Sequence, residues 1–138
     1  YTSVYGNTKA AVELLAQKLK DKGCPKVVVN DLARCDMAEA VEDAFRYGKL
    51  VLATTTYNGE IFPFMREFIN HLTERGYRNR TIGMIENGSW APMAARKMTE
   101  QLGNTMTVLP EKVTILSALK QSQHAELEAL ADALCNAN

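Results

Sequence analysis

The residues best suited to chemistry stand at the start of the chain, in a short loop before a predicted helix. The loop is rich in hydroxyl and amide groups and comprises Ser3, Val4, Tyr5, Gly6, Asn7 and Thr8. Backbone N–H groups at a helix N-terminus lack partners inside the helix, and the helix dipole makes that end positive. Gly6 lets the backbone approach an anion closely, because it has no Cβ. The loop therefore predicts a phosphate-binding site, although residues of these types also cap helices that bind no ligand.

Two more polar loops follow predicted strands, and each carries an aromatic side chain. One follows the run 50–53 and comprises Thr54, Thr55, Thr56, Tyr57, Asn58 and Gly59. The other follows the run 81–85 and comprises Glu86, Asn87, Gly88, Ser89 and Trp90. Tyr57 and Trp90 offer faces on which a flat heteroaromatic ring could stack. With the first loop, they predict a ligand that has a phosphate at one end and an aromatic ring at the other.

The three loops need a scaffold that brings them together, and alternating strands and helices supply one. Apolar residues recur at helical spacing over 8–21, 37–45, 63–75, 92–102 and 122–134. Apolar runs typical of strands covered on both faces occupy 26–30, 50–53, 81–85, 106–109 and 113–116. We therefore expect an α/β fold with a parallel sheet between two helical layers. Ligands of such sheets bind beyond the carboxyl ends of the strands, where the three loops would lie.

This arrangement requires one strand that the sequence does not contain. Only Tyr1 and Thr2 precede the first polar loop and the helix over 8–21. A doubly wound sheet has a central strand at this place. We expect that strand to lie upstream of residue 1.

Composition restricts the classes of function. The 138 residues suit one domain, and 16 basic and 16 acidic residues give a formal net charge of zero, without the basic excess of a nucleic-acid or membrane surface. No apolar run is long enough to span a membrane and no signal peptide is visible, so we expect a cytoplasmic protein. Cys24, Cys35 and Cys135 lie far apart without a CxxC motif, so we expect reduced, non-catalytic thiols.

The loops resemble those of a known family. The first resembles the FMN phosphate loop of flavodoxin-like proteins, and 54–59 resembles their second flavin loop. The segments 61–72 and 75–80 are similar in particular to the flavodoxin-like domain of flavodiiron proteins (A-type flavoproteins), and the resemblance runs from residue 1 to about Leu109. Thr55 replaces the usual proline of the second loop. The third loop departs further: it contains Pro92, and Glu86 would bring a carboxylate close to the flavin.

The resemblance implies a flavodoxin-like three-layer sandwich with strand order 2-1-3-4-5. It implies a single domain over 1–138, excised from a larger flavodiiron-type protein, that binds FMN. Electrons would pass from a reduced donor, a rubredoxin-like protein or a reductase, through the flavin to a diiron β-lactamase-like domain that reduces O2 or NO. The family's head-to-tail homodimer is a further expectation. This chain lacks the family's diiron cluster, and we expect His71 and His124 to bind no metal.

The expected site contains cofactor-binding residues and no catalytic residue, because electron transfer needs no general acid or base. Its members are Ser3, Val4, Tyr5, Gly6, Asn7, Thr8, Thr55, Thr56, Tyr57, Asn58, Gly59, Asn87, Gly88, Ser89 and Trp90. Two alternatives stay open. One is an FMN-dependent NAD(P)H reductase of the same fold. The other is a flavodoxin-like interaction module that has lost flavin, which Glu86 and the altered third loop would explain.

Overall fold

Two parallel strands form the middle of the structure, a computed structural model that describes residues 1–2, 7–24, 26–57, 60–61, 63–87, 93–115 and 121–136. β1 (Lys49–Tyr57) pairs with β3 (Thr81–Asn87) in register from Lys49–Thr81 to Thr55–Asn87. β4 (Thr107–Val108) and β5 (Val113–Ile115) both pair with β3 in parallel, at its beginning and at its end. Two short strands on either side of Pro110 were predicted, and the structure confirms them.

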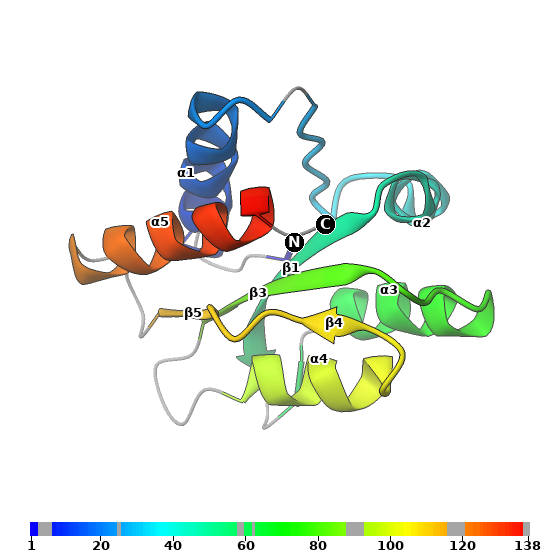
Figure 1. The fold of residues 1–138 in the computed structure, drawn as a ribbon. Helices are drawn as coiled ribbons and strands as arrows, with labels where there is room; N and C mark the ends of the chain where they lie inside the picture. The colour runs from blue at the N-terminus through cyan, green and yellow to red at the C-terminus, as the bar shows by residue number, and fades with distance from the viewer. Residues whose placement is uncertain are drawn as a thin grey trace.

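Helices cover both faces of this sheet, as the sequence predicts (Figure 1). α1 (Asn7–Asp21) and α5 (Gln121–Asn136) lie on one face. α2 (Met37–Arg46), α3 (Pro63–Glu74) and α4 (Ala94–Leu102) cover the other. The α/β class and the three layers are therefore confirmed.

Alternation along the strands divides the core between the two helical layers. Leu52 and Met84 pack with α2, α3 and α4, whereas Ala53 and Ile85 pack with α1 and α5. Consecutive strand residues point to opposite faces of a sheet, so neighbouring residues of β3 belong to different halves of the core. Gly83 belongs to the α5 side, where a Cβ on it would lie 3.0 Å from Leu130 Cδ1. This close approach explains why a glycine stands inside β3.

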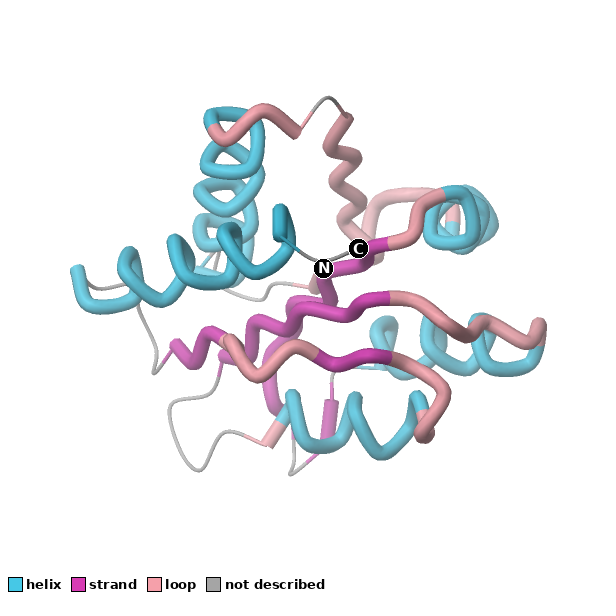
Figure 2. The backbone as a smooth tube through the Cα atoms, in the orientation of Figure 1, coloured by secondary structure: helices cyan, strands magenta, loops and turns pink. Residues whose placement is uncertain are grey.

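The strand expected at 26–30 does not form, and that prediction was wrong. Residues 26–30 are loop (Figure 2), and Val28 and Val29 are 45% and 46% exposed. A strand needs a neighbour to complete its backbone hydrogen bonds. Here Asn30 accepts a hydrogen bond from the Tyr1 amino group, 2.7 Å away, and Leu32 donates one to the Tyr1 carbonyl at 2.9 Å. Backbone hydrogen bonds to Tyr1 therefore reach the segment 26–30 only at its last residue, Asn30.

A cavity of about 390 Å³ separates β1 from residues 26–30. Tyr1 lines it, with apolar side chains from both helical layers that include Leu15, Leu50, Phe68 and Leu134. On the β1 side the Thr2 N–H donates to the Ala53 carbonyl at 3.0 Å. Tyr1 and Thr2 thus lie between β1 and residues 30–32, at the place expected for the central strand, and the cavity extends alongside them.

Candidate functional site

The carboxyl ends of β1 and β3 meet the beginning of α1 through buried polar side chains. Asn87 ends β3, and its Nδ2 donates to the Thr8 hydroxyl at 3.2 Å. The same hydroxyl lies 3.5 Å from that of Thr55 near the end of β1. Thr8 has no exposed surface and Asn87 is 8% exposed. One residue from each of the three predicted loops therefore joins one hydrogen-bonded cluster.

A second contact fastens the chain just before the first loop. The hydroxyls of Thr2 and Thr54 share a short, buried hydrogen bond, beside the backbone bond from Thr2 to Ala53. Neither Thr2 nor Thr54 was among the predicted site residues. Both hydroxyls are buried. Thr2 precedes the first predicted loop and Thr54 begins the second, and its position directly after an apolar run was the signal that could have identified it.

The beginning of α1 suits an anion. The helix starts at Asn7, so the last two residues of the predicted phosphate loop belong to its first turn, which contains no acidic residue. The Thr8 hydroxyl is engaged by Asn87, and the backbone N–H groups of this turn are donors that it can offer to a ligand. The dipole of the helix adds positive potential at the same end.

The second loop belongs to a hairpin that the sequence did not predict. β2 (Glu60–Ile61) pairs antiparallel with the end of β1, Thr56 with Ile61 and Tyr57 with Glu60. Only Asn58 and Gly59 lie between the paired residues. The backbone of β1 is thereby held by a partner up to Tyr57, the aromatic residue predicted to stack on a ring.

The Glu86 carboxylate points away from this cluster, contrary to expectation. Because Glu86 precedes Asn87 on β3, it faces the α4 side of the sheet. Its Oε1 accepts from the Ala95 N–H at 3.2 Å, its Oε2 accepts from the Thr114 hydroxyl at 2.9 Å, and Lys112 Nζ lies 3.1 Å from Oε2. Glu86 is 2% exposed. It fastens α4 and β5 to β3 on the face opposite Thr8.

The predicted site residues divide into those that the structure describes and those that it does not. Asn7, Thr8, Thr55 and Asn87 lie at the shared edge of the sheet, and Thr56 and Tyr57 belong to the backbone of β1. The remaining predicted residues lie outside the described part: Ser3, Val4, Tyr5, Gly6, Asn58, Gly59, Gly88, Ser89 and Trp90.

The cavity beside β1 lies elsewhere and has a different character. Its lining is mainly apolar and comes from the flank of β1, residues 26–30 and both helical layers. A phosphate would find few hydrogen-bond donors there, and its burial without them would be costly. We therefore place the candidate site at the carboxyl edge of the sheet and not in this cavity.

The two histidines lie on separate helices. His71 lies in the last turn of α3, 3.7 Å from Glu67, and His124 lies in the first turn of α5. The described residues contain no group of three or more His, Cys, Asp or Glu side chains able to hold a metal ion. No described helix combines the length and apolar character needed to cross a membrane.

Comparison of its sequence with known proteins assigns the chain to a protein family. A family model described as a flavodoxin domain matches residues 1–129. The anaerobic nitric oxide reductase flavorubredoxin of Escherichia coli (strain K12 / DH10B) is 23% identical over 104 residues, which are 74% of this chain and 22% of that protein. The chain thus spans about a fifth of the length of this curated relative.

Solved structures agree on the fold. The rubredoxin oxygen:oxidoreductase of Desulfovibrio gigas superposes with a TM-score of 0.89 at 17% identity, over 96% of this chain and 33% of that one. The flavodiiron protein of Giardia intestinalis gives 0.87 at 17% identity, over 95% and 33%. Flavodoxin 1 of Bacillus cereus gives 0.82 at 15% identity, over 99% and 95%. The same fold therefore occurs as a third of longer chains and as nearly a whole protein.

Proposed function

Since the chain belongs to the flavodoxin domain family, we propose that it binds FMN and relays electrons, as the flavin domain of a flavodiiron-type protein. The observation that carries the proposal is the cluster of Thr8, Thr55 and Asn87, which ties the three predicted flavin loops together at one edge of the sheet. When bound, FMN supplies one- and two-electron redox chemistry.

We propose that the two ends of FMN bind at this edge. Backbone N–H groups at the start of α1 would hold the phosphate, because the helix dipole is positive there and no acidic side chain opposes it. Ser3 and Asn7 would add side-chain donors. Tyr57 and Trp90 would cover the ring and exclude water, and the backbone at Asn58-Gly59 would hydrogen-bond to its polar rim.

The contacts of Glu86 bear on the flavin-free alternative. That alternative rested partly on a carboxylate close to the ring. Glu86 instead bonds to Ala95, Thr114 and Lys112 on the other face of β3. Its negative charge is paired there, so it gives no reason to expect that flavin is repelled.

The relay itself is proposed for a longer protein. The chain covers 22% of a flavorubredoxin and a third of two flavodiiron-type structures. We propose that electrons arrive from a rubredoxin-like protein or a reductase and leave to a diiron β-lactamase-like domain, in a homodimer. A net charge of zero is consistent with transfer between domains held together, which needs no long-range electrostatic steering.

FMN titration tests the proposal. The purified chain, with its fold checked by circular dichroism, is added to FMN and to riboflavin, which lacks the phosphate. We expect FMN fluorescence to be quenched at stoichiometric protein, and riboflavin to bind at least about 100-fold more weakly, as expected when charge-assisted bonds to an anion are lost. A folded chain that leaves FMN fluorescence unchanged would contradict the proposal.

A second measurement separates the relay from the reductase alternative. NADH and NADPH are added anaerobically to the FMN-loaded chain while the flavin absorbance is followed. The relay predicts slow or no bleaching without a donor protein. Rapid bleaching by either nucleotide would favour the reductase.

A further inference from the structure

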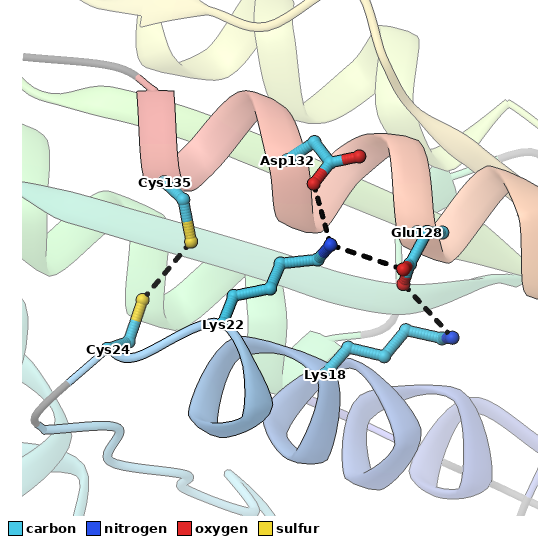
Figure 3. A network of polar contacts seen from close by, with 6 residues as sticks. All are labelled: Lys18, Lys22, Cys24, Glu128, Asp132 and Cys135. Carbon is cyan, nitrogen blue, oxygen red and sulfur yellow. Dashed lines mark hydrogen bonds and ion pairs between the residues drawn. The ribbon is translucent and has the colours of Figure 1, made fainter.

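Two cysteines that are far apart in the sequence lie with their sulfur atoms in contact. Cys24 Sγ and Cys135 Sγ are 3.3 Å apart, across 111 positions of sequence (Figure 3). Cys24 lies three residues after the end of α1, where its N–H donates to the Leu19 carbonyl at 3.1 Å, and Cys135 lies in the last turn of α5. Both are partly exposed free thiols, so a small reagent can reach them.

Ion pairs hold the two cysteine-bearing segments in place. Lys22 Nζ lies 2.6 Å from Asp132 and 3.1 Å from Glu128, and Lys18 Nζ lies 3.1 Å from Glu128 (Figure 3). All four side chains join the end of α1 to the last turns of α5. Exposed pairs of this kind add little stability one by one, but a network fixes the spacing between helices.

A backbone contact also anchors the end of α5 to the sheet. Lys49 at the start of β1 donates from its Nζ to the Leu134 carbonyl, the residue before Cys135. Cys135 is therefore held from two sides, by α1 and by β1. Little movement is needed to bring two sulfur atoms from 3.3 Å to the S–S bond length of about 2.05 Å.

We propose that Cys24 and Cys135 are a site of reversible disulfide formation, with a low-molecular-weight disulfide as the oxidant. The thiolate of one cysteine attacks a sulfur of the small disulfide, forms a mixed disulfide and expels one small thiolate. The second cysteine, as thiolate, attacks the protein sulfur of the mixed disulfide and expels the other. The two protein sulfurs lose two electrons to the small disulfide, and the two thiol protons end on the two small thiols.

The bond would fasten a part of the fold that has few other attachments. Among the residues that the structure describes, 26–30 have no strand partner along their length, and they come shortly after Cys24. Cys24 and Leu134 also line the cavity beside β1. A disulfide would therefore link a residue of the cavity lining, Cys24, to α5.

The surroundings set how the reaction responds to pH. Burial is the main cause that raises the pKa of the Cys135 thiol, and the hydrogen bond with Cys24 acts in the same direction, while Lys49 and Lys22 oppose them. Because the thiolate is the reacting form, exchange should become faster as the pH rises toward this raised pKa and should level off above it.

Cys35 provides the matched control. It lies in the turn before α2 and packs against the core on the opposite face of the sheet. Burial raises the pKa of its thiol, and Asp31 and Asp36 are among its neighbours. The proposal therefore assigns it no part in the bond.

The experiment treats the folded chain with oxidised glutathione, then alkylates it and maps the peptides without reduction. Cys35→Ser should lose both free thiols, fall in mass by about 2 Da and yield one peptide pair joined through Cys24 and Cys135. Its thermal midpoint should rise by about 5–15 °C on oxidation and return on reduction. Cys24→Ser and Cys135→Ser should each form no intramolecular bond.

Three results would overturn the proposal: persistent mixed disulfides with glutathione on Cys35→Ser, a bond that includes Cys35 in the unmodified chain, or linkage only between molecules. Because Cys35→Ser keeps both proposed partners, the test does not depend on the folding of the other variants. It also requires no FMN, so its outcome is separate from that of the proposed function.

Discussion

Asn87 and Thr8 are 79 positions apart in sequence, yet the side-chain amide of Asn87 donates to the buried Thr8 hydroxyl at 3.2 Å. The bond joins the last residue of β3 to the second residue of α1. Thr55 Oγ1 lies 3.5 Å from the same hydroxyl, so β1 shares the contact. The three loops of the candidate site are thus linked at their bases by hydrogen bonds, and a substitution in one loop should affect the other two.

Replacing Asn87 should weaken both the fold and the site. Asn87→Ala leaves the buried Thr8 hydroxyl without its donor and should lower the free energy of unfolding by about 1–2 kcal/mol. FMN affinity should fall several-fold. Urea unfolding and fluorescence titration measure the two effects. Asn104→Ala, at an exposed position, is the control and should change neither.

Replacing Glu86 should affect stability through α4 and β5. Glu86→Ala removes the acceptor of the Ala95 N–H and the Thr114 hydroxyl, at a cost of about 2–3 kcal/mol. Glu86→Gln keeps one acceptor oxygen and should cost less. Glu100→Ala removes an exposed carboxylate that pairs with Arg96, and should cost less than about 0.5 kcal/mol. Equal losses for Glu86→Ala and Glu100→Ala would contradict this account.

Adding a methyl group at Gly83 should strain the packing of α5 on the sheet. The new Cβ would lie 3.0 Å from Leu130 Cδ1, and Leu130 is fully buried. We expect Gly83→Ala to cost about 1 kcal/mol or more, by overpacking. Gly48→Ala meets no atom within 4 Å and should be neutral or stabilising. Thermal unfolding of both variants is the measurement, and a stabilised Gly83→Ala would show that Leu130 has room to move.

The Tyr77 hydroxyl should make stability sensitive to alkaline pH. Burial raises the pKa of Tyr77 to about 12, against the partial opposing effect of Arg80. An unfolded tyrosine ionises near pH 10, so between about pH 10 and 12 the unfolded chain has lost a proton that the folded chain keeps. Stability present below pH 10 is therefore lost as the pH rises toward 12. Tyr77→Phe should lose less over this interval in urea titrations.

Tyr77→Phe should not lower the stability of the protein at neutral pH. Within the described part of the chain, the buried Tyr77 hydroxyl makes no hydrogen bond. Removal of an unpaired polar group should leave stability unchanged or raise it by up to about 1 kcal/mol. The edge contact of the ring with Phe45 and its stacking under Arg80 survive in phenylalanine. A large loss in Tyr77→Phe at pH 7 would mean that the hydroxyl has a partner.

The cavity beside β1 should accept an added strand. Five residues of alternating Val and Ile placed before Tyr1 would extend Tyr1-Thr2 between β1 and residues 26–30. We expect burial of these side chains to raise the free energy of unfolding by at least about 2 kcal/mol. Five residues of Gly and Ser form the control extension. Equal thermal midpoints for the two extensions would contradict a strand position at the cavity.

Local pattern was enough to predict most of the scaffold, and it is also the basis on which the candidate site is predicted. The apolar runs at 50–53 and 81–85 became β1 and β3, and the helices after each polar loop formed as predicted. Thr8, Thr55 and Asn87 were identified as site residues because they follow strands or begin a helix. The face of Glu86 could also have been read from its place next to Asn87, since strand alternation is a local property.

The sequence by itself thus determined the helices and most of the strands, because side-chain period is a local property of the chain. Three features depended on contacts between distant segments. Residues 26–30 have no ladder of strand neighbours in the described part of the chain and are loop despite three consecutive valines. Glu86 contacts Ala95 of α4 and Lys112 after β4. Cys24 contacts Cys135, which is 111 positions away in the sequence. Such pairings are decided by how the layers pack, and no spacing along the chain encodes them.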